Sequence, residues 1–353
     1  MRAALFAAVT PLVALPLASA PASADRAEIP VAEVPSEELC TPPDPVLAEL
    51  SGLTVLGETI YATPDAGADE SVVALNSDCS VAQRFTPPVD PYDVEDLAAG
   101  PDGRLWLGDT GDNTQSRPTV ALISLDPATG AGELYRLTYP DGPRDAETLL
   151  VSADGEPVII TKALFGPSGV YRPVRERGLT ELDSPGPTPL EKVGALALGP
   201  TETPGGPLPG ASSTLITGGA VSADGTVAAV RTYTDVYLFH APDRDIAAAL
   251  AEGPDLRIPV PDEPQGEAVA FTASGDLLTA SETGTQTGTV AAVQPPIRIL
   301  RSVVDLFADE SVAATPEVST SAVVPLAVAA SAAVVAVGAG RWWWRSRRSR
   351  GHR

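Results

Sequence analysis

The densest cluster of polar residues is the run Gly-Asp-Thr-Gly-Asp-Asn at residues 108–113, with Asp93 upstream of it. Carboxylate and amide oxygens on a glycine-containing loop suit a hard cation such as calcium, and the lack of Cys and His in the cluster argues against zinc. The spacing differs from that of an EF-hand loop, and such runs also form turns supported by their own side chains. The predicted ligands are Asp93, Asp109, Asp112 and Asn113 for Ca²⁺; the alternative is a turn that holds no cofactor.

Positive charge enters this acidic sequence at Lys162 and at the run Arg231-Thr232-Tyr233. These side chains could capture a carboxylate or phosphate group, directly or through a metal ion. The alternative is that they pair with Glu147 or Glu267 and hold neighbouring repeats in register, because charges in a channel must be paired or solvated.

Nucleophilic hydrolysis by a Ser-His-acid set is disfavoured. The histidines are His240, at the end of an apolar run, and His352, near the C-terminus, and the sequence contains no Gly-x-Ser-x-Gly. The abundance of acids leaves two other hydrolytic chemistries open, which are carboxylate-pair attack on a glycoside and metal-assisted hydrolysis of a phosphate ester.

These polar residues stand at the two ends of a repeated unit, in which an apolar run, a turn on Gly and a second apolar run follow one another. The four clear copies span Glu95–Asp109, Glu147–Lys162, Thr217–Arg231 and Glu267–Glu282, and a fainter copy spans Glu49–Asp65. One or two further extended runs follow each copy, so each unit has about four strands. A short helix is predicted at residues 244–252.

A four-stranded unit repeated at nearly constant length predicts an all-β protein, a β-propeller of five blades. A sixth blade would need the Pro-Gly insertion at residues 200–212 or the terminal strands, and a β-sandwich pair would not explain the constant spacing. In a propeller the two ends of each inner hairpin reach one face near the central channel, and the turn residues Asp102, Asp154 and Asp224 reach the other. The predicted ligand-binding residues are Glu95, Asp109, Glu147, Lys162, Arg231, Tyr233, Glu267 and Glu282.

Both ends of the chain carry targeting signals. Residues 1–24 have the layout of a signal peptide, with Ala22-Ser23-Ala24 as a cleavage site, and an uncharged run at residues 322–340 is followed by Trp and Arg residues. Nineteen residues at about 1.5 Å each span roughly 28 Å, close to a hydrocarbon core. The predicted order is signal peptide (1–24), Pro-rich acidic strap (25–47), propeller (48–305), linker (306–321), membrane helix (322–340) and basic cytoplasmic tail (341–353). We therefore expect a single-pass plasma-membrane protein with its propeller outside the cell.

Charge and cysteine content narrow the partners. The signal and tail contain seven arginines and no acid, so removing them takes the net charge from -23 to -30. Such a surface repels nucleic acid, which is excluded as a partner.

The two cysteines, Cys40 and Cys79, are predicted to form a disulfide, as an even pair in an exported chain most often does; a thiol nucleophile or a metal pair is the alternative.

A series of motifs along residues 40–282 resembles a family of exported bacterial β-propeller proteins. The motifs are ELSGL at Glu49, DVEDLA at Asp93, GDTGDN at Gly108, YPDGPRDAETL at Tyr139, TK at Thr161, TGGAVSADG at Thr217, RTY at Arg231 and QGEAVAF at Gln265. That family is distantly similar to the NHL, strictosidine-synthase-like and phytase-like propellers. The resemblance implies the propeller fold and an extracytoplasmic setting, and its phytase-like branch suggests calcium and phosphate. The dense acid clusters of the phytase-like enzymes are not matched residue for residue, so their activity is not carried over.

Three functions follow as hypotheses. The channel face binds a partner protein, an envelope polymer or a small ligand; or it is a calcium-dependent hydrolase of phosphate or glycosidic bonds; or the propeller is an inert spacer of the cell envelope.

Overall fold

The structure is a computed structural model that describes residues 28–65, 71–286, 289–290 and 294–308. The predicted signal peptide (1–24), membrane helix (322–340) and basic tail (341–353) lie outside the described residues, as does most of the predicted linker. Within the described part of the chain, no helix is long and apolar enough to cross a bilayer.

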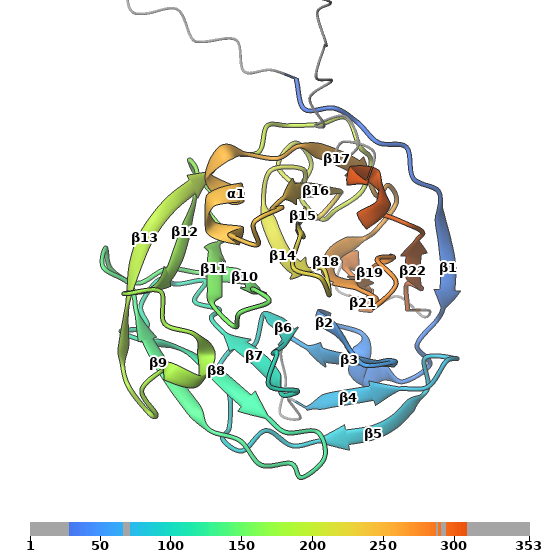
Figure 1. The fold of residues 1–353 in the computed structure, drawn as a ribbon. Coiled ribbons are helices and arrows are strands. Elements are labelled where there is room, and N and C mark those ends of the chain that lie inside the picture. The colour runs from blue at the N-terminus through green and yellow to red at the C-terminus, as the bar shows by residue number, and fades with distance from the viewer. Residues whose placement is uncertain (1–27, 66–70, 287–288, 291–293, 309–353) are drawn as a thin grey trace, which may run out of the picture.

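The described chain forms a ring of four-stranded antiparallel sheets, arranged as the blades of a propeller (Figure 1). The first blade contains β2 (Leu50–Leu56), β3 (Thr59–Pro64), β4 (Val72–Leu75) and β5 (Val81–Phe85); the second β6 (Asp96–Ala99), β7 (Leu105–Asp109), β8 (Val120–Leu125) and β9 (Leu134–Thr138); the third β10 (Ala146–Val151), β11 (Pro157–Thr161), β12 (Ser168–Pro173) and β13 (Thr188–Leu196). The fourth contains β14 (Ile216–Val221), β15 (Val227–Thr232), β16 (Asp235–His240) and β17 (Leu256–Pro259), and the fifth β18 (Gln265–Phe271), β19 (Leu277–Glu282), β22 (Ile297–Leu300) and β1 (Ser36–Cys40).

Smaller elements complete the ring. A short parallel contact between β9 and β13 joins the second and third blades into one sheet. The predicted helix is present as α1 (Ile246–Glu252), whose N-cap Asp245 accepts a hydrogen bond from the Ala248 N–H (2.9 Å). A ribbon of β20 (Thr285–Gln286) and β21 (Thr289–Val290) and 3₁₀ turns at Pro45–Leu47, Leu179–Glu181 and Val304–Phe307 are the remaining elements.

The hydrophobic core is divided among the seams between blades. Each innermost strand contacts the next in the cyclic order β2, β6, β10, β14, β18 and back to β2. Five buried apolar clusters fill the five seams of the described ring, as Leu150 and Phe239 do between the third and fourth blades. Burial of this apolar surface is the main stabilising contribution. The five predicted hairpins are therefore confirmed, and each packs between two neighbouring blades.

The structure has five blades in its described part because the two candidate sources of a sixth are used otherwise. Residues 197–215 form no strand; Thr201 and Thr203 there donate hydrogen bonds to the Asp235 carboxylate (2.7 and 2.8 Å). The predicted Pro-rich strap contributes β1, which supplies the outermost strand of the fifth blade by pairing with β22. The propeller therefore starts before residue 48.

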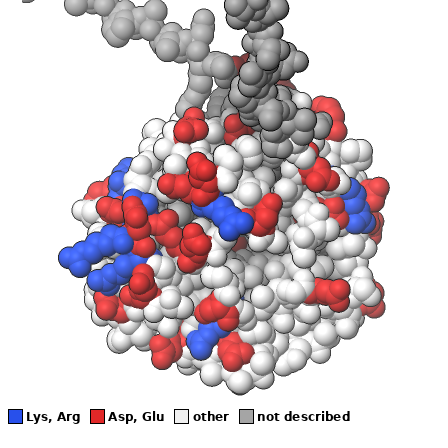
Figure 2. Space-filling model, viewed as in Figure 1, with Lys and Arg blue, Asp and Glu red and all other residues white. Residues whose placement is uncertain are grey.

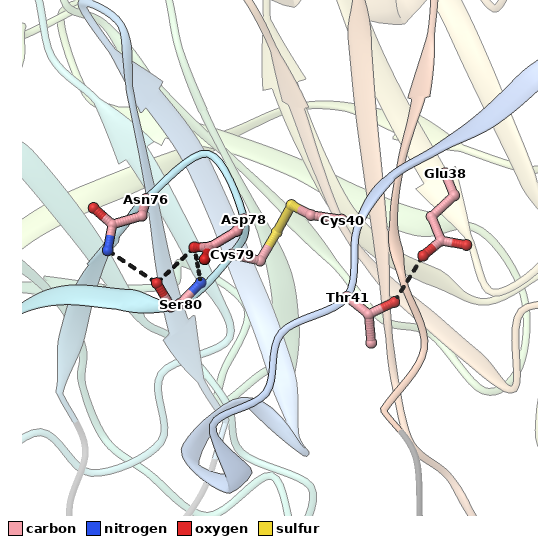
Figure 3. The surroundings of a disulfide bond; sticks show 7 residues. All are labelled: Glu38, Cys40, Thr41, Asn76, Asp78, Cys79 and Ser80. Carbon is pink, nitrogen blue, oxygen red and sulfur yellow. Dashed lines mark hydrogen bonds between the residues drawn. A yellow bond between two sulfur atoms is a disulfide. The ribbon is translucent and has the colours of Figure 1, made fainter.

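A disulfide between Cys40 and Cys79 strengthens the closure of the ring (Figure 3). Cys40 ends β1 in the fifth blade, and Cys79 lies in the turn between β4 and β5 of the first blade, where Asp78 accepts two hydrogen bonds from Ser80. The predicted disulfide is thus present, and it links the last blade to the first.

The inner hairpin turns lie on the face opposite the strand ends that the sequence predicts to be functional. Gly103, Gly155 and Gly225 in these turns have φ of 75°, 86° and 77°, a conformation that glycine adopts without strain. The end of the described chain also packs here, since the Val304 N–H donates to the carbonyl of the hairpin glycine Gly275 (3.1 Å).

In the view of Figure 2 acidic side chains outnumber basic ones, and charged side chains gather most densely on the left.

Candidate functional site

A β-bulge near the start of four of the five innermost strands, β2, β10, β14 and β18, builds most of the first row of the site. In β10, for example, the register shifts between Ala146 and Thr148, which leaves Glu147 as the extra residue. In β6 the equivalent residue is Glu95, whose N–H donates to the carbonyl of Gly108, the register partner of the next residue. A bulge turns its extra side chain out of the regular ladder. The five residues in this row are the four bulge residues Ser51, Glu147, Thr217 and Glu267, and Glu95 directly before β6.

The second row follows from the same register, because each returning strand of an inner hairpin ends beside the bulge. The residues in equivalent positions are Asp65, Thr110, Lys162, Tyr233 and Glu282. A third row, two positions before the bulge, includes Asp93, Asp145 and Gln265. We call the ionisable residues of these rows that converge on the channel the acidic mouth: Asp65, Asp93, Glu95, Asp145, Glu147, Lys162, Glu267 and Glu282.

One contact in the mouth joins two blades, and the others lie within a single blade. Lys162 forms an ion pair with Glu147, and its Nζ lies 5.1 Å from the centre of the Tyr233 ring of the next blade. Gln265 donates hydrogen bonds from Nε2 to both Glu267 (3.0 Å to Oε1) and Glu282. The single lysine and the single amide therefore contact the carboxylates of the third and fifth blades.

Two groups of three carboxyl groups in the mouth could hold a metal ion. Oxygens of Asp65, Asp93 and Glu95 lie within 4.8 Å of one another, and so do oxygens of Glu95, Asp145 and Glu147. Glu95 belongs to both groups, so the two candidate sites adjoin. Carboxylate oxygens alone are ligands of a hard cation such as calcium rather than of zinc.

Burial makes the ionised form of these carboxyl groups costly. Burial raises the pKa of Glu95 well above its ordinary value, and the charge of Glu147 raises it further. Burial likewise raises the pKa of Glu147, which Lys162 lowers only in part. The pKa values of Asp93 and Asp145 are also raised, again mainly by burial.

The pKa values of the groups around the edge of the mouth are also raised. Burial and the neighbouring Glu267 raise the pKa of Asp65 to about 7 and that of Glu282 to about 10. Burial opposes the charge of Lys162, but Glu147 and Glu267 outweigh it and raise the pKa of the lysine, which stays protonated. Seven acids face one lysine, so full ionisation of the mouth requires a further cation.

Glu147 has an acceptor that nothing in the described structure satisfies. Its side chain is almost fully buried; one carboxylate oxygen binds Lys162, and Oε2 has no hydrogen-bond partner among the described residues. An unpaired buried polar atom costs about 1–3 kcal/mol. Glu147 belongs to the candidate metal site formed with Glu95 and Asp145, so an ion bound there would satisfy this oxygen.

Three of the four residues predicted to bind metal lie in the loop at residues 108–117, outside the two groups of converging carboxylates. Both carboxylate oxygens of Asp112 accept backbone N–H groups, those of Ser116 (2.9 Å) and Arg117 (2.8 Å), and Asp109 forms an ion pair with Arg117 (2.8 Å). Asn113 is exposed. Of the predicted set, Asp93 is the one that belongs to a candidate metal site, together with Asp65 and Glu95.

Arg231 lies between blades rather than in the mouth. It is fully buried, pairs with Glu263 (2.6 Å) and donates to the carbonyl groups of Ala268 (2.9 Å) and Ala280 (3.2 Å) in the fifth blade. The alternative that this arginine holds neighbouring blades together therefore agrees with the structure, but its partner is Glu263 rather than Glu147 or Glu267. The register places Tyr233, two residues later, at the mouth.

Sequence reasoning missed Asp145 and Gln265 and placed Glu49, which is exposed, where the register has Ser51. A signal for the first two exists in the sequence. Asp93-x-Glu95 and Asp145-x-Glu147 repeat one spacing at the same place in two blades, and Gln265-x-Glu267 repeats it in a third.

No protein-family model and no curated protein matches this chain. Solved structures with a similar fold include a gluconolactonase from Xanthomonas campestris, with 12% sequence identity, a TM-score of 0.39 and coverage of 72% of each chain. A streptogramin B lyase has 12% identity and a TM-score of 0.33 over 73% of this chain and 66% of the lyase. The PQQ-bound aldose sugar dehydrogenase of Streptomyces coelicolor has 10% identity and a TM-score of 0.38 over 77% of this chain and 98% of the dehydrogenase. These likenesses concern the fold alone.

Proposed function

We propose that the acidic mouth binds a divalent cation, calcium first, and that the propeller is a calcium-dependent binding module at this face. The observation that carries the proposal is the buried Oε2 of Glu147, which lacks a partner within the described residues and belongs to a group of three converging carboxyl groups. Bound calcium would supply the positive charge that the single lysine does not, and its open coordination positions would accept an oxygen of a ligand.

The setting of this module follows from the predicted signal peptide and C-terminal membrane helix. Together they would hold the propeller on the outer side of the plasma membrane, where millimolar calcium can occupy weak sites. The excess of acids disfavours nucleic acid as the ligand, so a protein, an envelope polymer or a small molecule remains.

A second candidate, calcium-dependent hydrolysis of a phosphate or glycosidic bond, is favoured by one observation. Asp65 belongs to one candidate metal site, which shares Glu95 with the other, and its pKa of about 7 would suit proton transfer near neutral pH. Turnover of aryl phosphates or aryl glycosides that requires calcium and is lost in Asp65→Asn would favour this candidate over binding alone.

Calorimetric titration of the full chain with calcium tests the proposal. We expect Glu95→Gln to weaken calcium binding at least about tenfold, because it removes a ligand that the two candidate metal sites share. Glu252→Gln, at the exposed end of α1, is the matched control and should bind as wild type does.

The same titration separates binding from the inert-spacer hypothesis. A wild-type chain that gives no calcium-dependent heat and no calcium-dependent rise in melting temperature contradicts the proposal. Thermal unfolding without calcium shows whether Glu95→Gln is folded, since loss of a buried charge should leave its melting temperature at or above that of wild type at pH 8.

A further inference from the structure

A groove of about 450 Å³ runs from the acidic mouth along the third blade. Its lining includes Asp145 and Lys162 of the mouth, the basic residues Arg144 and Lys192, and Phe165. Three basic residues to one acidic residue is the reverse of the whole chain, in which 46 acids face 23 Lys and Arg. Lys162 is paired with Glu147, so the positive charge that the groove offers comes mainly from Arg144 and Lys192 at its outer end.

The outer basic pair is held in place by one carboxylate. Asp141 lies 3.1 Å from Arg144 and 3.8 Å from Lys192, and it accepts a hydrogen bond from the hydroxyl of Tyr171 (2.9 Å). The Nζ of Lys192 lies 5.6 Å from the centre of the Tyr171 ring. Two positive charges against one negative charge leave a net positive wall, and both basic side chains stay accessible, at 36% and 43% exposure.

The rest of the wall is apolar and exposed. Leu164 and Phe165, in the loop between β11 and β12, are 66% and 94% exposed. Large side chains this exposed are uncommon on the described surface, and here two adjacent ones line the same groove as the basic residues. Exposed apolar side chains beside fixed charges are typical of a site for a ligand with both characters.

We propose that this groove binds a soluble amphipathic anion. The oxyanion group would lie between Lys162 at the inner end and the pair Arg144 and Lys192 at the outer end, and the aromatic or acyl body would cover Phe165. The proposal deepens the proposed function, because the groove opens on the acidic mouth and so names the class of ligand that a calcium-loaded mouth would meet.

Fluorescence titration of the full chain with two matched probes tests this inference. The probes are 1-anilinonaphthalene-8-sulfonate, an aromatic anion, and N-phenyl-1-naphthylamine, the same ring system without the sulfonate. We expect wild type to bind the sulfonate at least about tenfold more tightly than the amine, because charged hydrogen bonds hold it.

Variants assign that preference to the groove. The double variant Arg144→Gln and Lys192→Gln should weaken sulfonate binding about tenfold and leave the amine unchanged. Phe165→Ser should weaken both probes. Arg301→Gln removes an exposed arginine that pairs with Asp276 in another blade, and as the matched control it should change neither.

Equal affinity for the two probes in wild type, or unchanged sulfonate affinity in the double variant, overturns the inference. The calcium titration of the mouth is read separately from these results. Groove-dependent sulfonate binding without any calcium binding supports the groove and refutes the proposed function, and calcium binding with groove-independent sulfonate binding does the reverse.

Discussion

The stability of the calcium-free propeller should fall as the pH rises from 5 to 8, and Asp65→Asn should reduce that fall. The pKa of Asp65 is raised from 3.8 to about 7, by burial first and then by Glu267, Asp93 and Glu49, while Lys162 lowers it. The folded state therefore keeps a proton that the unfolded chain releases. Stability from this group is fully present below about pH 4 and is lost as the pH rises through 7.

The size of the effect follows from the shift. Between pH 5 and pH 7 the loss extends over about two pH units at about 1.4 kcal/mol each, which sets an upper limit of about 3 kcal/mol. Asp65 is partly accessible to solvent, which screens its neighbours, so we expect about 2 kcal/mol. In a chain of this size each kcal/mol changes the melting temperature by about 2–4 °C, which gives a difference of about 4–8 °C.

Calorimetric melting of the full chain in EDTA at pH 5 and pH 8 measures it. From pH 5 to pH 8 Asp65→Asn should gain stability relative to wild type, because the variant has no carboxyl group to ionise at this position. Asp154→Asn, at an exposed hairpin turn on the other face, is the control and should follow wild type. The reasoning is refuted if wild type gains stability between pH 5 and pH 8, or if Asp65→Asn loses as much as wild type does.

Two further predictions concern the joints between blades. Arg231→Met leaves Glu263 buried without its partner and should lower the free energy of unfolding by about 3–5 kcal/mol, whereas Arg301→Ala at an exposed ion pair should lower it by at most about 1 kcal/mol; similar urea midpoints for the two variants would contradict the role given to the buried pair. Replacing both Cys40 and Cys79 with Ser should cost up to about 4 kcal/mol, and adding a reductant should destabilise wild type but not this variant. Equal sensitivity of both proteins to reductant would exclude a stabilising disulfide.

The fold was predictable because local sequence patterns specify the repeated hairpin. Alternating apolar runs and turn glycines such as Gly103 and Gly225 recur at fixed spacing, and they specify strands and turns without reference to distant residues. The outermost strand of the fifth blade was not predictable in this way. Residues 36–40 contain one apolar side chain besides Cys40, and they become a strand because β22 presents an unpaired edge.

The site was predictable to the accuracy of the register. Counting from the ends of hairpins placed Glu95, Glu147, Lys162 and Glu267 correctly at the mouth, but bulges shift the register of four inner strands by one residue. Arg231 was expected at the mouth for that reason, although its side chain points between blades. Loop residues were harder still, since the hydrogen bonds that occupy Asp109 and Asp112 depend on how the loop closes.

The described part of the chain ends beside the hairpin at Gly275, which bears on the orientation that the predicted membrane anchor would impose. The described residues end on the side of the hairpin turns, and strands such as β18, with seven residues at about 3.3 Å each, separate that side from the mouth by about 20 Å. A membrane anchor after Ala308, as the sequence predicts, would hold the propeller with its hairpin turns toward the membrane and its acidic mouth away from it. Ligands would then arrive from the surrounding medium, and molecules embedded in the membrane would meet the hairpin turns instead.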